Sequence, residues 1–156
     1  MRLTTLGPTH PDVVASWATS PDECRRWCSQ DWVTPGEVLR WGTETEVLAY
    51  LALVDGEPAG YGELWLDDEE AEVELARIIV APALRGRGLG RRMVTMLTAL
   101  ARDHHPAVLM RVHPGNTAAL RCYATAGFQP VPPEQAEGWN RDQPVSYTWL
   151  RHRGDA

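Results

Sequence analysis

The chain has 156 residues, of which 44% are hydrophobic and 23% charged, a composition typical of one soluble globular domain. These values exclude disordered, collagen-like and coiled-coil proteins. The net charge of −6 argues against generic DNA binding, because the phosphate backbone repels an acidic chain. We therefore expect one domain over residues 1–156 that binds no nucleic acid.

Membrane spans, secretory leaders and disulfides are not predicted. The longest apolar run, residues 47–54, is far shorter than the roughly 20 residues that cross a bilayer. The first eight residues lack the apolar stretch of a signal peptide. The three cysteines, Cys24, Cys28 and Cys122, have neither zinc-ribbon nor Cys-x-x-Cys spacing. We expect reduced thiols, no metal, no membrane partner and a cytoplasmic location.

Charge is distributed unevenly along the chain. All 15 basic residues are arginine. Residues 41–76 hold 11 acids and no arginine, whereas residues 77–102 hold six arginines and no acid. One segment that holds an anion and another that faces a cation would explain this pattern. A solvated acidic hairpin beside a solvated helix would explain it equally well.

The predicted elements form a mixed α/β domain. In chain order they are strand 3–6, helices 11–17 and 21–29, strands 47–54, 57–66 and 72–80, helix 89–103, strand 107–112, helix 117–125, and strands 128–131 and 145–150. The first two helices have proline in their first turns. Asp55-Gly56 predicts a hairpin turn, and Gly127 stands where a helix-ending glycine belongs.

A glycine-rich turn, residues 86–90, joins a strand to the helix at 89–103. Its three glycines leave backbone N–H groups unobstructed at a helix N-terminus, which carries roughly +0.5 charge and suits a phosphate or pyrophosphate. A Walker loop would need a lysine, which the chain lacks. A Rossmann fingerprint would need G-x-G-x-x-G directly after the strand, whereas this chain has G-x-G-x-G after five intervening residues. The turn alone identifies no ligand.

The longer segment, residues 80–90, resembles the motif of the GNAT superfamily of N-acetyltransferases. In that family V-x-P leads into R/Q-x-x-G-x-G/A, and this chain reads V-A-P-A-L-R-G-R-G-L-G. A second family element is an asparagine, a tyrosine seven residues later and then x-x-x-G-F. Asn116, Tyr123 and the pair Gly127-Phe128 match it. The resemblance covers essentially the whole chain.

The resemblance implies a fold and an activity. The fold would be a single α/β domain with a largely antiparallel central sheet, flanked by helices, and a V-shaped cleft for acetyl-coenzyme A. The activity would be transfer of acetyl to a primary amine of a small molecule by direct attack in a ternary complex, with no metal. Alternatives are a protein or peptide amine as acceptor, or a non-catalytic acyl-coenzyme A sensor. The sequence itself does not indicate an oligomeric state, and the resemblance suggests a homodimer only because dimers are common in the family.

Site residues follow from the same resemblance. Those expected to hold acetyl-coenzyme A are Ile78, Ile79, Val80, Arg85, Gly86, Arg87, Gly88, Gly90, Arg91, Asn116 and Tyr123. The glycine turn would bind the pyrophosphate, and the pantetheine arm would pair with the strand end. The N–H of Ile78 or Ile79 would polarise the thioester carbonyl. Asn116 would contact pantetheine or cap its helix, and Tyr123 would protonate the departing thiolate.

A general base is expected on the strand at 72–80. Glu74 occupies a position where some family members place a glutamate base. Glu72, Glu63 or a water chain remain alternatives. By strict alternation, residues 72, 74, 76, 78 and 80 would share one face. Arg111 stands where members that acetylate ribosomal protein N-termini often carry glutamate, which weighs against that subgroup.

The acceptor site is expected to be aromatic and acidic, which suits an organic cation. Aromatic residues in the regions that build this site in the family are Trp17, Trp27, Trp32, Trp41, Trp139 and Tyr147. We expect at least half of them to be packing residues, and Trp27 to point inward. A small amine, polyamine, amino acid, aminoglycoside or peptide amine would each fit.

Overall fold

The computed structural model describes residues 1–154. Its elements are β1 (Arg2–Thr5), α1 (His10–Ala15), α2 (Pro21–Cys28), α3 (Pro35–Trp41), β2 (Val47–Val54), β3 (Glu57–Asp67), β4 (Glu72–Val80), the 3-10 turn η1 (Pro82–Leu84), α4 (Leu89–Arg102), β5 (Ala107–Val112), α5 (Thr117–Thr125), β6 (Phe128–Pro130), α6 (Pro133–Asn140) and β7 (Thr148–His152). In this described part, no helix has both the length and the apolar character needed to cross a membrane.

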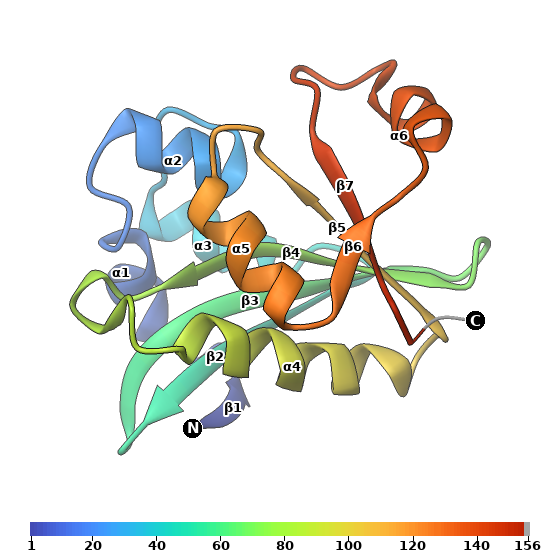
Figure 1. The fold of residues 1–156 in the computed structure, drawn as a ribbon. Helices are drawn as coiled ribbons and strands as arrows, with labels where there is room; N and C mark the ends of the chain where they lie inside the picture. Colours follow the sequence, from blue (N-terminus) through green and yellow to red (C-terminus); the bar gives the residue numbers. More distant parts are fainter. Residues whose placement is uncertain (155–156) are drawn as a thin grey trace.

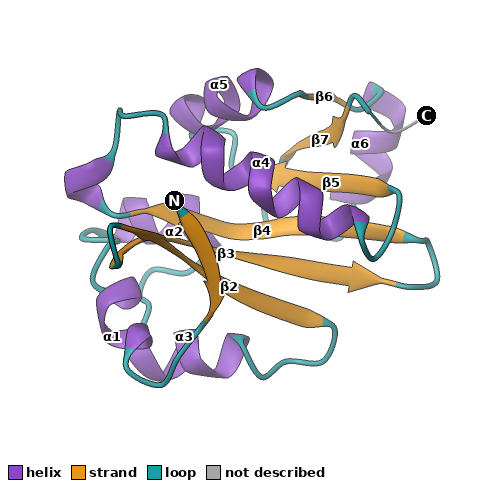
Figure 2. Ribbon diagram, turned by 90° about the horizontal axis from the view of Figure 1, so that it is seen from below, coloured by secondary structure: helices purple, strands orange, loops and turns teal. Residues whose placement is uncertain are grey.

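The strands form one sheet in the order β1-β2-β3-β4-β5-β7-β6 (Figure 1). Every neighbouring pair is antiparallel except β4 and β5. Helix α4 covers one face, and its buried side chains share a core with β3, β4 and β5. Helices α1 and α3 cover the opposite face (Figure 2). The predicted mixed α/β, largely antiparallel fold is therefore confirmed.

The two parallel strands diverge soon after they meet. β4 pairs with β5 only over Glu72–Glu74, opposite residues 107–109. Beyond that point β4 continues beside β3, while β5 continues beside β7. The ends of β4 and β5 therefore separate beyond Glu74.

β4 carries one more residue than its partner β3 at this divergence. Tyr61 pairs with Ile79, but Glu63 pairs with Ala76, so the register shifts by one residue. A bulge reverses the alternation of side chains beyond it. Ile78 and Val80 consequently pack against the core under α4, whereas Glu74 lies on the other face. The expectation that residues 72, 74, 76, 78 and 80 share one face is wrong, because periodicity does not reveal a bulge.

Local turn chemistry matches the sequence in several places. Asp55 and Gly56 both have positive φ, at 51° and 82°, as the predicted hairpin turn requires. Gly127 has a φ of 97° directly after the α5 C-cap. Helices α3 and α6 were not predicted, and the last strand begins at Thr148 rather than at residue 145. A capping box of Thr34 and Glu37 begins α3, so its start signal was present in the sequence.

Candidate active site

A cavity of about 720 Å³ lies between the end of β4, the start of α4 and helix α5. It contains every residue predicted to hold acetyl-coenzyme A except Arg87. Sequence reasoning missed Arg26, Trp27 and Arg121, which also line the cavity. Arg26 and Trp27 come from α2, and a single sequence gives no indication that this helix approaches β4.

The glycine turn has a backbone that suits an anion. Gly86 and Gly88 have φ values of 75° and 76°, and Gly88 is the N-cap of α4 without a side-chain hydrogen bond. The first N–H groups of a helix have no partner within it, so they are available to a phosphate. A Cβ at Gly86 or Gly88 would meet nothing within 4 Å, which leaves room for a ligand above the turn. This turn therefore fits a pyrophosphate.

The side chain of Arg85 binds two backbone carbonyls and lies near one carboxylate of the protein. Its Nε donates to the carbonyl of Val80 at 3.0 Å, and its NH2 group donates to the carbonyl of Trp17 at 3.2 Å. Its NH1 group lies 3.5 Å from Glu23. Arg85 thus fastens the glycine turn to β4 and to the end of α1. Arg91 also lines the cavity, and its guanidinium is predicted to bind the pyrophosphate.

Helix α5 forms the opposite wall of the cavity. The Asn116 side chain accepts a hydrogen bond from the Ala119 N–H at 3.3 Å and so caps the helix. Tyr123 is buried, and burial raises the pKa of its phenol above the ordinary value. It is therefore protonated at neutral pH. A Cβ on Gly90 would lie 3.3 Å from Cys122 Sγ, so glycine there permits the close approach of α4 and α5.

Glu63, one of the alternative bases, is completely buried. Its carboxylate accepts hydrogen bonds from the Tyr61 hydroxyl at 2.5 Å and the Trp65 indole at 2.6 Å, and pairs with Arg77 at 3.1 Å. Burial raises the pKa of Glu63, and the Arg77 charge opposes that change. A carboxylate with no exposed surface cannot contact an acceptor amine directly. Glu63 is a structural group.

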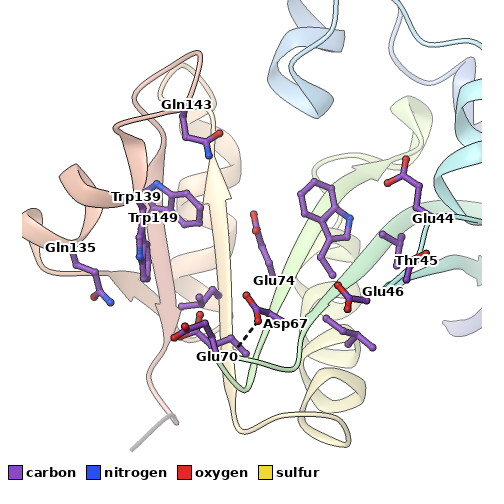
Figure 3. Close-up of a pocket in the computed structure, with 15 residues that line it drawn as sticks. Glu44, Thr45, Glu46, Asp67, Glu70, Glu74, Gln135, Trp139, Gln143 and Trp149 are labelled. Atoms are coloured by element: carbon purple, nitrogen blue, oxygen red, sulfur yellow. Dashed lines mark hydrogen bonds between the residues drawn. The ribbon is translucent and has the colours of Figure 1, made fainter.

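A second cavity, of about 670 Å³, lies on the face of the sheet that bears Glu74 (Figure 3). Six carboxylates line it, those of Glu44, Glu46, Asp67, Glu70, Glu72 and Glu74. Its aromatic lining consists of Trp65, Trp139 and Trp149. Within residues 1–154, Glu44, Glu46 and Glu70 form no salt bridge. Uncompensated carboxylates beside indole rings favour an organic cation.

Glu74 forms a two-point ion pair with Arg111 of β5. The Arg111 Nε and NH2 groups lie 2.5 and 2.8 Å from the two carboxylate oxygens, and NH1 donates to Gln143 at 3.1 Å. The guanidinium carbon also lies 4.8 Å from the ring centre of Trp149. Arg111 thus holds Glu74 in the lining of the acidic cavity. Its role as base stays a prediction.

The predicted aromatic residues divide between packing and site. Trp17 and Trp41 are core residues, and Trp27 packs edge-on against Trp41 with ring centres 5.5 Å apart, as expected for an inward residue. Trp32 is 74% exposed. Trp139 alone of the predicted tryptophans lines the acidic cavity. Trp65 was missed there because its strand was not assigned to the acceptor site. Trp149 was missed although it shares the predicted strand 145–150 with Tyr147, which was named.

Cys24, Cys28 and Cys122 are free thiols. Residues 1–154 contain no group of three or more potential ligands that could hold a metal ion.

The family model of the Acetyltransferase (GNAT) family matches residues 11–128. That segment is more than half of the chain, and it contains both the glycine turn and the tyrosine of the predicted site. The protein therefore belongs to the GNAT family, which confirms the resemblance seen in the sequence.

Two groups of curated relatives match parts of the chain. Aminoglycoside N(6')-acetyltransferase type 1 of Klebsiella pneumoniae is 28% identical over 99 residues, covering 55% of this chain and 49% of that protein. N-alpha-acetyltransferase RimI of Mycobacterium tuberculosis is 43% identical over 60 residues, covering 38% of this chain and 37% of that protein. The matched segment thus spans about half, or less, of each relative.

Solved structures share the whole fold at low identity. Aminoglycoside acetyltransferase AAC(6')-Ib in complex with coenzyme A and kanamycin gives a TM-score of 0.74 at 18% identity, covering 97% of this chain and 94% of that one. Spermidine N-acetyltransferase from Vibrio cholerae with coenzyme A and spermine gives 0.71 at 16% identity, covering 84% and 82%. At such identities the likeness establishes the fold.

Proposed function

We propose that this protein is an acetyl-coenzyme A-dependent N-acetyltransferase that acts on a primary amine of a small molecule. One observation carries the proposal: the glycine turn, the end of β4 and Tyr123 line a single cavity. Membership of the GNAT family supports it. The matched aminoglycoside acetyltransferase and the structural neighbour with bound spermine both support a small-molecule acceptor.

Different residues of the coenzyme cavity bind acetyl-coenzyme A and assist acetyl transfer. Acetyl-coenzyme A, when bound, supplies the acetyl thioester. The N–H groups of the turn around Gly88 hold the pyrophosphate, with Arg91 beside them. The Ile78 or Ile79 N–H donates to the thioester carbonyl oxygen, where negative charge develops during attack. Tyr123 gives its phenolic proton to the departing sulfur, a role that its raised pKa permits at neutral pH.

The acceptor amine enters from the acidic cavity. An ammonium group with a pKa of about 10.4 is neutral in roughly one molecule in two thousand at pH 7, so a proton acceptor is needed. Glu74 is the proposed base, oriented by its two bonds to Arg111. Glu72 and a water chain remain alternatives. The other carboxylates that line the cavity hold the cationic parts of the acceptor beside the tryptophan side chains.

The test is release of the coenzyme A thiol from acetyl-coenzyme A in the presence of a panel of amines. The panel contains aminoglycosides, polyamines, amino acids and short peptides, and mass spectrometry of the product verifies a gain of one acetyl group. Acetylation of metabolite amines supports the proposal, and acetylation of peptides alone would replace it with a peptide acceptor. Binding without any transfer would indicate an acyl-coenzyme A sensor.

A homodimer and a cytoplasmic location are part of the same proposal. Analytical ultracentrifugation of the purified protein measures the first, and fractionation of the source cells measures the second.

A further inference from the structure

The bulge in β4 is built around Arg77. This residue has a φ of 47°, in the left-handed region that a residue with a side chain adopts only at a cost in free energy. Such a conformation persists only where its surroundings enforce it. The next two residues, Ile78 and Ile79, line the coenzyme cavity. The strained residue therefore directly precedes the proposed amide donors.

The side chain of Arg77 is clamped from three sides. Its NH1 group lies 3.1 and 3.4 Å from the two oxygens of the buried Glu63. Its guanidinium carbon lies 4.2 Å from the ring centre of Trp41 and 4.9 Å from that of Trp65. The side chain is only 16% exposed. A planar guanidinium between two indole rings has little freedom to rotate.

The backbone carbonyl of Arg77 has a hydrogen bond of its own, in addition to the contacts of the side chain. A bulge takes a residue out of the regular ladder, and the Arg77 carbonyl accepts a hydrogen bond from the Trp27 indole N–H at 2.8 Å. Trp27 in turn packs edge-on against Trp41 and against Tyr61, which donates its hydroxyl to Glu63. The side chain and the carbonyl of Arg77 are thus held by one connected cluster.

We propose that Arg77 is a positioning residue for acetyl transfer, whose clamped side chain holds the bulge and so directs the donor amide, that of Ile78 or Ile79, at the thioester. This inference rests on the proposed function. Without these contacts, β4 reaches a lower free energy when Arg77 leaves the left-handed conformation. Loss of the bulge would shift the register by one residue and turn the following residues over.

The amide signals of Ile78 and Ile79 can be observed selectively by NMR, because these residues are the only isoleucines in the chain. Protein labelled with ¹⁵N-isoleucine gives two amide signals, which the Ile79→Val variant assigns. In the wild type we expect coenzyme A to move both signals, and acetyl-coenzyme A to move one of them further. In Arg77→Met we expect both signals to lie elsewhere before any ligand is added, and the difference between the two ligands to disappear.

Kinetics separate positioning from folding. A misplacement of about 1 Å costs roughly 100-fold in rate, so Arg77→Met should lower kcat about 10- to 100-fold. The dissociation constant for coenzyme A should rise much less, because the glycine turn is untouched. Arg77→Lys keeps the charge but loses the planar stack, and should recover part of kcat. Arg77→Gly removes the clamp but also the cost of the left-handed backbone, so the bulge is retained more readily and kcat should fall less than in Arg77→Met.

The matched control is Arg25→Met, which removes an exposed arginine and its ion pairs with Asp22 and Asp31 on α2. Its kcat and its isoleucine signals should match the wild type. If Arg77→Met does not fold, Arg77→Lys and Glu63→Gln provide the same readouts with smaller changes in volume.

Two results would overturn the inference. One is a folded Arg77 variant with wild-type kcat, and the other is unchanged isoleucine signals in that variant. A wild type that acetylates no amine defeats the proposed function instead. Even then, the isoleucine signals still show whether Arg77 holds these amides against bound coenzyme A, so the two failures are distinguishable.

Discussion

Arg111 and Glu74 are joined by two hydrogen bonds across the line where β4 and β5 stop pairing. Glu74 is the last residue of β4 that pairs with β5, and Arg111 lies two residues beyond its partner Leu109. The ion pair therefore bridges the two strands where they separate. It also orients the carboxylate of the proposed base, which lines the acidic cavity.

A double-mutant cycle separates the structural and catalytic roles of this pair. We expect Glu74→Gln and Arg111→Met to show a coupling of about 1–2 kcal/mol in the free energy of unfolding, measured by denaturant titration. If Glu74 is the base, its substitution also lowers kcat by about 100-fold or more. Arg111→Met should lower kcat much less, because it leaves the Glu74 carboxylate in place. Equal kinetic effects of both substitutions would assign Glu74 to structure alone.

The Tyr123→Phe variant tests whether Tyr123 is the general acid that protonates the departing thiolate. The substitution removes one hydroxyl from a buried ring, so the fold and the affinity for coenzyme A should change little. Loss of a general acid should lower kcat about 100-fold or more. Steady-state kinetics and a calorimetric titration with coenzyme A measure the two quantities. A variant with wild-type kcat would make Tyr123 a packing residue.

Buried tyrosines also predict how stability depends on pH. Burial raises the pKa of Tyr61 and Tyr123 in the folded protein, whereas in the unfolded chain both ionise near pH 10. The stability that comes from burying their neutral forms is complete below about pH 10 and is lost as the pH rises above it. Thermal unfolding at increasing pH should show this decline, and Tyr123→Phe should reduce it. The same decline in the variant would assign it to other groups.

The conformation of Gly88 is open to a matched comparison. Gly88 has a φ of 76°, whereas Gly138 lies inside α6, and a Cβ at either position would meet nothing within 4 Å. Gly88→Ala should lower stability by about 1–2 kcal/mol because of the left-handed backbone, and should weaken coenzyme A binding. Gly138→Ala should raise stability by up to about 1 kcal/mol without affecting binding. Unchanged binding in Gly88→Ala would argue against the turn as the anion site.

The charge of the acidic cavity should govern acceptor affinity. Glu44→Gln and Glu46→Gln should each raise KM for a polyamine roughly two- to fivefold, the effect of one charge pair at short range in water. Added salt should raise KM in the wild type and less so in the variants. Glu57→Gln, at the β2–β3 hairpin, is the matched control and should leave KM unchanged. Equal KM values in all variants would place the acceptor elsewhere.

Local signals in the sequence predicted much of the fold. The strands 47–54, 72–80 and 107–112 and the helix 117–125 were placed with their observed bounds, because each lies between clear turn or cap residues. The helix over Pro133–Asn140 was missed because its N-cap, Pro132, offers no side-chain hydrogen bond and Gly138 lies in its interior. The coenzyme cavity was predicted through motifs that lie close together in the chain.

The acceptor side could not be predicted in the same way. The cluster of Glu63, Arg77 and Trp41 joins two strands and a helix that are far apart in sequence, and the bulge that orients it breaks the two-residue period. The contact between Arg111 and Trp149 likewise depends on the pairing of β5 with β7. Motifs record local chemistry, whereas these contacts depend on tertiary packing.

Calorimetric titration with acetyl-coenzyme A, followed by the same titration with ATP, tests the central claim most directly. We predict that one acetyl-coenzyme A binds per chain and that ATP binds far more weakly, because ATP has no pantetheine arm to pair with the end of β4. Equal binding of both ligands would indicate a general nucleotide site. An absence of acetyl-coenzyme A binding by folded protein would contradict the proposed function, although the GNAT fold would stand.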